Sequence, residues 1–128
     1  MLGSYRVKTV AILGIAFKQN TDDIREAPAI DIITALQSAG AKVRAYDPQA
    51  MEQARQALTD VTFCQNAYLC AEGASALVIV TEWDAFRALD LARIKDALSE
   101  PTVVDLRNIY SPSDMRRRGF RYFSVGRQ

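Results

Sequence analysis

Apolar residues in this chain occur in short continuous runs that alternate with longer stretches of mixed apolar and polar residues. Residues 76–80 (ALVIV) form the clearest of these runs. Continuous apolar runs of this length are typical of strands that are buried on both faces of a parallel sheet. The pattern predicts five or six strands, at residues 7–13, 42–46, 61–64, 76–80, 102–106 and 121–125, of which the run at 61–64 is the shortest.

The stretches between these runs show the spacing of amphipathic helices. In residues 28–39, Ile30, Ile33 and Leu36 fall on one face, and Gly40 is placed to end the helix. Further helices are expected at residues 67–72 and 90–98, and a short one is expected after Ser111 or Ser113 and before Gly119.

A second helix is expected to follow the strand at residues 42–46. Asp47 is placed to cap it, and Pro48 suits its first position because proline has no N–H to satisfy there. Met51, Ala54 and Leu58 would then face inward.

Strands that alternate with helices through short connections predict an α/β fold. We expect a doubly wound, three-layer sandwich with a mostly parallel sheet of five or six strands, which is a Rossmann-like arrangement. The sequence shows no internal repeat, low-complexity tract or linker. Residues 1–128 are therefore expected to form a single domain.

Composition excludes several classes of function. Lys and Arg number 16 and Asp and Glu 15, so the net charge of +1 gives no reason to expect a nucleic acid or membrane partner. No apolar stretch approaches the length of a membrane span, and the N-terminus lacks a secretory signal. With two cysteines and no histidine, neither a disulfide framework nor a zinc site is expected. We expect a reduced, cytoplasmic protein.

Ligands of open α/β sheets bind beyond the carboxyl ends of the strands. A dinucleotide-binding turn would carry several glycines there, but only Gly14 follows the first strand, with the bulky Ile15 and Phe17 after it. We therefore do not expect this chain to hold the pyrophosphate of NAD in the usual way. Asp47 matches the position of a ribose-binding acid, but without the glycines a helix cap is the better interpretation.

Cations follow the first and fifth predicted strands. Lys18 and Arg25 lie in the segment after Leu13, and Arg107 comes just after Asp105. Lysine and arginine side chains suit a ligand such as a nucleotide diphosphate. From the residues alone, Lys18 and Arg25 are equally well explained as solvated side chains paired with neighbouring acids.

Other polar and aromatic groups at these ends have simpler interpretations. Asp22 and Asp23 lie too far past the strand for the acidic pocket of a receiver domain. Trp83 and Phe86 either line the crevice or pack in the core beneath the loop, and we favour the core. Residues 116–118, three arginines, are expected to favour the dipole of the last helix rather than form an anion site.

Several segments in sequence order resemble one known family. Residues 14–28 (GIAFKQNTDDIREAP) are similar to the signature that opens the C-terminal domain of the UDP-glucose/GDP-mannose dehydrogenase family. Further stretches fit as well, at residues 45–48 (AYDP), 81–83 (TEW) with Phe86, and 104–108 (VDLRN). The ending, residues 119–127, is similar to the bacterial UDP-glucose 6-dehydrogenase subgroup, whose members serve polysaccharide biosynthesis.

The resemblance implies an NAD-dependent oxidoreductase that oxidises the primary alcohol of UDP-glucose twice, to UDP-glucuronate, through a cysteine nucleophile. It implies that Lys18 contacts the UDP-sugar with Phe17 beside it, and that Arg107 reaches the substrate from the neighbouring loop. Arg25 is implied to help hold NAD across an interdomain cleft. The full-length enzymes of this family are expected to be homo-oligomers.

The resemblance covers only part of such an enzyme. The NAD-binding N-terminal domain, the central helix that pairs subunits, and the segment with the catalytic cysteine do not occur in this sequence. Cys64 and Cys70 lie outside that motif, and we interpret them as small core residues. We expect no catalytic residue here and no activity of the chain alone. The alternative hypothesis is a stand-alone nucleotide-binding or interaction module without catalysis.

Overall fold

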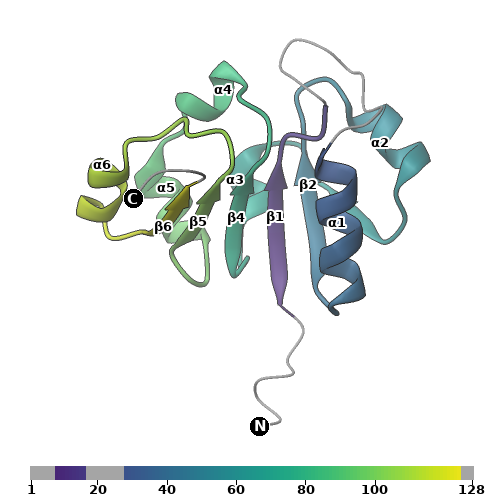
Figure 1. Ribbon diagram of the computed structural model, residues 1–128, viewed down its shortest axis with the longest axis horizontal. Helices are drawn as coiled ribbons and strands as arrows, with labels where there is room; N and C mark the ends of the chain where they lie inside the picture. The colour runs from purple at the N-terminus through teal and green to yellow at the C-terminus, as the bar shows by residue number, and fades with distance from the viewer. Residues whose placement is uncertain (1–7, 17–27, 125–128) are drawn as a thin grey trace, which may run out of the picture.

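In a computed structural model that describes residues 8–16 and 28–124, the chain forms a twisted six-stranded sheet in the order β3-β2-β1-β4-β5-β6 (Figure 1). Every neighbouring pair is parallel. The strands are β1 (Thr9–Leu13), β2 (Lys42–Tyr46), β3 (Val61–Phe63), β4 (Ala76–Ile79), β5 (Thr102–Asp105) and β6 (Arg121–Ser124). The predicted α/β class and the sixth strand are confirmed.

Helices cover both faces of this sheet. They are α1 (Pro28–Ser38), α2 (Met51–Ala57), α3 (Ala67–Ala71), α4 (Asp84–Arg87), α5 (Leu91–Ala97) and α6 (Pro112–Arg117). Side chains of α1 and α2 join one apolar cluster, and those of α3, α4, α5 and α6 join another. The result is the expected three-layer sandwich.

The two central strands supply both layers of the core. In β1, Ala11 and Leu13 point into the cluster beneath α3 and α5, whereas Val10 and Ile12 point into the cluster beneath α1. This alternation follows from the two-residue period of a strand. It explains why the predicted strands appear as continuous apolar runs rather than as alternating ones.

Most element boundaries follow the sequence prediction; the two differences are helix α4 and the start of α2. Ser111 caps α6 through its side chain, as expected for one of the two candidate serines. Helix α4 was not predicted, because four residues are too few to show a helical period. The regular part of α2 begins at Met51, with Ala50 before it and no side-chain cap, so the prediction of a helix that starts at Pro48 was wrong.

Candidate functional site

Three buried polar side chains lie at the carboxyl ends of the strands. Asp47 follows β2, Thr81 comes shortly after β4, and Asp105 ends β5; they are 1%, 1% and 0% exposed. Polar groups with so little contact with water need hydrogen-bond partners inside the protein. Their partners are the loops that leave this edge of the sheet.

One oxygen of Asp47 holds the start of the segment after β1. Its Oδ2 accepts hydrogen bonds from the backbone N–H of Ile15 at 2.7 Å and of Ala16 at 3.0 Å. The indole N–H of Trp83 donates to the same oxygen at 3.3 Å. The carboxylate thus joins the chain after β2 to the loops that follow β1 and β4.

The other oxygen of Asp47 holds the turn that follows it. Its Oδ1 accepts from the N–H of Gln49 and of Ala50, each at 2.8 Å. These are the bonds that a helix cap would make, but here they close a turn that precedes α2. The donors of residues 49 and 50 are satisfied by this carboxylate, and the regular helix starts only after them.

Gly14 is required by a close approach and by its backbone conformation. Its φ is +96°, and a Cβ at this position would lie 2.5 Å from Cβ of Thr81. Thr81 also donates its hydroxyl to the carbonyl of Ala16 at 2.8 Å. The space beside this glycine is therefore filled by a threonine side chain rather than left open for a ligand.

Asp105 organises the loop that follows β5. Its Oδ2 accepts from the N–H of Ile109 at 2.8 Å, from the N–H of Tyr110 at 3.0 Å and from the hydroxyl of Tyr122 at 2.6 Å. Its Oδ1 accepts from the N–H of Arg107 at 3.1 Å. The backbone that carries Arg107 is therefore held on a buried anchor.

The guanidinium of Arg107 makes an exposed ion pair. Its Nη2 lies 2.8 Å from Oε1 of Glu82, and Glu82 also lies 3.8 Å from Nη2 of Arg87. The side chains of Arg107 and Glu82 are 40% and 33% exposed. Because a pair this exposed contributes little free energy, an anionic ligand can compete with Glu82 for the arginine.

Of the four predicted site residues, the described part of the chain includes Arg107. Phe17, Lys18 and Arg25 lie outside the described residues, whereas Arg107 lies at the carboxyl end of β5 as expected. Trp83 and Phe86 are 6% and 0% exposed, which confirms that they pack in the core.

The two cysteines form a contact that sequence analysis missed. Cys70 is buried, but Cys64 is only partly buried and follows β3. The Cys64 and Cys70 thiols donate to the carbonyls of Thr62 and Ile12, each at 3.9 Å. The interaction with Cys70, together with the charge of Arg44, lowers the pKa of Cys64 from 9.0 to about 7 against the opposing effect of burial. The same contact and deep burial raise the pKa of Cys70. A spacing of six residues between two cysteines gave too little signal to predict this pair.

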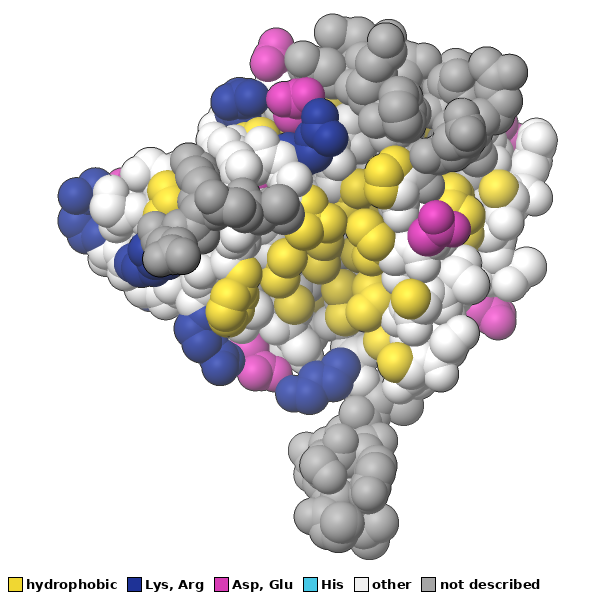
Figure 2. Space-filling model, viewed as in Figure 1, with side chains coloured by type: hydrophobic (Ala, Val, Ile, Leu, Met, Phe, Trp, Pro, Cys, Tyr) yellow, Lys and Arg dark blue, Asp and Glu magenta, His cyan; other side chains and the backbone are white. Residues whose placement is uncertain are grey.

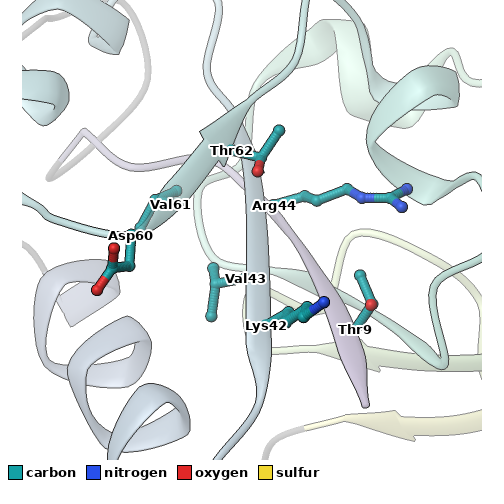
Figure 3. A pocket seen from close by; sticks show the side chains of 7 residues that line it. All are labelled: Thr9, Lys42, Val43, Arg44, Asp60, Val61 and Thr62. Atoms are coloured by element: carbon teal, nitrogen blue, oxygen red, sulfur yellow. The ribbon is translucent and has the colours of Figure 1, made fainter. Parts of the chain in front are cut away.

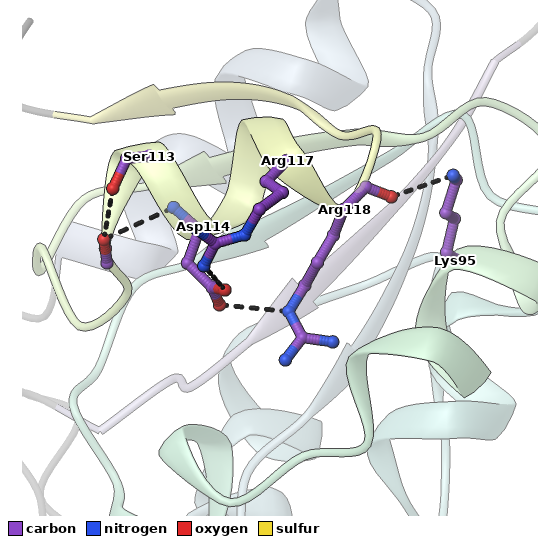
Figure 4. A network of polar contacts seen from close by, with 6 residues as sticks. Lys95, Ser113, Asp114, Arg117 and Arg118 are labelled. Atoms are coloured by element: carbon purple, nitrogen blue, oxygen red, sulfur yellow. Dashed lines mark hydrogen bonds and ion pairs between the residues drawn. The ribbon is translucent and has the colours of Figure 1, made fainter.

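Two of the arginines at residues 116–118, Arg117 and Arg118, pair with an acid of their own helix (Figure 4). Arg117 and Arg118 both bond the carboxylate of Asp114, at 2.8 and 3.0 Å. These contacts, of which the one from Arg118 is the stronger, lower the pKa of Asp114. Lys95 donates to the carbonyl of Arg118 at 2.9 Å, close to the C-terminus of α6. Arg117 and Arg118 are thus held by ion pairs at the end of α6.

A pocket of about 570 Å³ lies at the opposite edge of the sheet, beside the amino ends of β1, β2 and β3. Its lining includes Lys42, Arg44 and Asp60. Figure 3 shows that Asp60 and Arg44 point to different sides of the strands. The guanidinium of Arg44 is already bonded to the carbonyl of Glu72. These side chains do not converge on a common point, so we do not assign a site there.

The described residues include neither a metal-binding cluster nor a membrane-spanning helix. No group of three or more cysteine, aspartate or glutamate side chains there is placed to hold a metal ion. Among the helices of this part of the chain, none has the length and apolar character to cross a bilayer.

Relatives of this chain are dehydrogenases of nucleotide sugars. The model of the UDP-glucose/GDP-mannose dehydrogenase family, UDP binding domain, matches residues 11–112. UDP-glucose 6-dehydrogenase of Rhizobium meliloti (strain 1021) is 49% identical over 125 residues, which are 98% of this chain and 29% of that protein. UDP-glucose 6-dehydrogenase TuaD of Bacillus subtilis (strain 168) is 40% identical, over 99% of this chain and 28% of that protein.

Solved structures agree with the sequence relatives. A UDP-glucose dehydrogenase from Pyrobaculum islandicum superposes with a TM-score of 0.76 at 32% identity, over 96% of this chain and 26% of that one. An NDP-N-acetyl-D-galactosaminuronic acid dehydrogenase from Methanosarcina mazei Go1 superposes with a TM-score of 0.83 at 27% identity, over 95% of this chain and 25% of that one. The chain thus spans less than a third of the length of these relatives. It belongs to the UDP-glucose/GDP-mannose dehydrogenase family and corresponds to the UDP-binding domain of that family.

Proposed function

We propose that this chain binds the UDP-sugar of an NAD-dependent UDP-glucose 6-dehydrogenase, which oxidises UDP-glucose to UDP-glucuronate. In this proposal Lys18 and Arg107 hold the UDP-sugar, Phe17 lies beside it, and Arg25 faces the cofactor. The observation that carries the proposal is Arg107, whose backbone is anchored on Asp105 and whose guanidinium has an exposed, replaceable partner in Glu82.

Each part of this arrangement has a role in binding. The buried Asp105 fixes where the β5 loop begins, so Arg107 is positioned before the ligand arrives. Asp47 and Thr81 do the same for the segment that leads toward Lys18, through the backbone of Ile15 and Ala16. Positioning of this kind reduces the entropy lost when a ligand binds.

The described residues do not fit the pyrophosphate of NAD, because Thr81 occupies the space beside Gly14. NAD, which accepts hydride in the reactions of such enzymes, would therefore be held mainly by a different part of the polypeptide. In the same proposal the cysteine nucleophile also lies outside this chain. Cys70 is buried, and Cys64 follows the edge strand β3, which β2, β1 and β4 separate from β5 and the loop of Arg107. The chain alone is expected to bind substrate but not to oxidise it.

Calorimetric titration of the chain with UDP-glucose tests the proposal. Lys18→Ala and Arg107→Ala should each weaken binding by about 10-fold or more, since a charge-assisted hydrogen bond contributes about 1.5–3 kcal/mol. Arg117→Ala is the matched control, because its guanidinium is also exposed and paired with a carboxylate but lies on α6. If UDP-glucose does not bind, or if all three variants bind it equally, the chain is better described as an interaction module.

A further inference from the structure

One half of the sheet has a face without a helix over it among the described residues. Helices α1 and α2 pack over β1, β2 and β3 on this face, whereas α3, α5 and α6 pack on the opposite face. Figure 2 shows hydrophobic side chains gathered at the centre of this surface, between β6 and α1 of Figure 1. All-parallel sheets are usually covered by helices on both faces.

The residues of this surface form a row in register across four strands. Ile12 of β1 pairs with Val78 of β4, Val78 with Val104 of β5, and Val104 with Phe123 of β6. Ile12 is fully buried, Val78 is 8% exposed, Val104 is partly exposed, and Phe123 is 58% exposed. Exposure thus rises with each strand away from α1. We call Val78, Val104 and Phe123 the apolar row.

Phe123 owes its position to the pleat of β6. Its neighbour Tyr122 points to the other face, where it is 4% exposed and bonds Asp105. Because successive side chains alternate, residue 123 must face the side without a helix. A single exposed apolar residue is ordinary, but here Phe123 and the partly exposed Val104 extend the buried core toward the edge of the sheet.

Charged pairs bound the apolar row at both ends of the strands. At the amino ends, Glu100 lies 3.0 Å from Lys8 and 3.2 Å from Arg121. At the carboxyl ends, Glu82 pairs with Arg107. A polar rim around an apolar centre is the usual composition of a protein interface.

We propose that the apolar row is the docking surface for a helix with one apolar side, supplied by the part of the dehydrogenase polypeptide that lies outside this chain. The chain spans 29% of the length of its rhizobial relative, so the larger part of such an enzyme is available to cover it. Two strand spacings separate β4 from β6, about 10 Å, which is close to the diameter of a helix. The inference rests on the proposed function only for the identity of the partner, and it does not involve Lys18 or Arg107.

The test compares this chain alone with a chimaera in which it replaces the matching segment of the Rhizobium meliloti enzyme. Phe123→Cys places a thiol in the apolar row. Leu69→Cys is the matched control, because Leu69 on α3 is the other large hydrophobic residue described as exposed, at 47%, and lies on the opposite side of the sheet. Maleimide labelling of each site is followed by mass spectrometry of peptides, in the absence of UDP-glucose.

Residue 123 should label at least about 10-fold more slowly in the chimaera than in the chain alone, whereas residue 69 should label at the same rate in both. Hydrogen–deuterium exchange of the β6 peptide, without any substitution, should show the same protection. Equal labelling of residue 123 in both proteins would overturn the proposal. So would protection in the chain alone that grows with its concentration, because a second copy would then cover the row. Because the labelling is done without UDP-glucose, neither result bears on the proposal that the chain binds the UDP-sugar.

Discussion

Oδ2 of Asp47 accepts a hydrogen bond from the backbone N–H of Ile15 at 2.7 Å, although the two residues are 32 positions apart in the sequence. The bond crosses from the end of β2 to the end of β1, which are neighbours in the sheet. It places a buried charge directly beneath the segment that leads to Lys18. The architecture of the candidate site therefore depends on acids at strand ends rather than on a glycine-rich turn.

Asp47→Ala is expected to destabilise the fold strongly. The substitution leaves the buried N–H groups of Ile15 and Ala16 without an acceptor, and each unsatisfied donor costs about 1–3 kcal/mol. We expect the free energy of unfolding to fall by about 3–5 kcal/mol in urea denaturation. Asp96→Ala, at an exposed position of α5, should change it by less than about 0.5 kcal/mol. Similar losses in the two variants would contradict the role given to Asp47.

Gly14→Ala should destabilise the protein more than Gly40→Ala does. Both glycines have positive φ, +96° and +93°, so both substitutions strain the backbone. A Cβ at residue 14 would collide with Thr81, whereas a Cβ at residue 40 meets nothing within 4 Å. We expect a loss of about 1 kcal/mol for Gly40→Ala and at least about 2 kcal/mol more for Gly14→Ala. Thermal or urea unfolding measures both, and equal losses would show that the contact with Thr81 is not decisive.

Alkylation of Cys64 should depend on pH with a midpoint near 7. The pKa of this thiol is lowered from 9.0 to about 7, so the reactive thiolate forms as the pH rises through 7. Iodoacetamide labelling, resolved by peptide mass spectrometry, gives the midpoint. Because the interaction with Cys70 is the largest cause, Cys70→Ala should move it up toward the unshifted value of 9.0.

Cys64→Ser provides the control for that experiment. The remaining Cys70 is fully buried, and burial by itself keeps its pKa raised after Cys64 is removed, so this variant should label very slowly in the folded state. A wild-type labelling rate that rises only above pH 8 would contradict the proposed contact between the two thiols.

The fold could be predicted because its signals are local. Runs such as residues 76–80 are apolar on both faces, and this property specifies buried parallel strands in a single pass along the sequence. The start of α2 could not be predicted in the same way. Asp47 followed by proline indicates a cap, but the competing partners of this carboxylate come from residues 15, 16 and 83, which only the fold brings near.

In the candidate site too, local signals could be predicted from the sequence and contacts between distant residues could not. Arg107 could be predicted as a cation at a strand end, and Asp105 before it ends an apolar run. The role of Asp105 depends on Tyr122, a residue on another strand, and the partner of Arg107 is Glu82 on another loop. A polar residue directly after the last buried residues of a predicted strand is the signal that would have found Asp47, Thr81 and Asp105 together. Such a residue leaves the buried sheet with its polar group still covered, so it must bond a neighbouring loop.

Glu82→Gln is expected to strengthen binding of UDP-glucose. In the free chain Glu82 holds the guanidinium of Arg107 at 2.8 Å, and the ligand must displace it. An exposed pair of this kind contributes up to about 1 kcal/mol, so its removal should increase affinity by about 2-fold to 5-fold. The free energy of unfolding should change by less than about 1 kcal/mol for the same reason.

Calorimetry measures the affinity, and Glu100→Gln is the matched control because Glu100 forms comparable exposed pairs at the other end of the strands. Weaker binding in Glu82→Gln would mean that Glu82 orients Arg107 toward the ligand instead of competing with it. If Glu100→Gln increases the affinity equally, the gain comes from the more positive net charge and not from the release of Arg107.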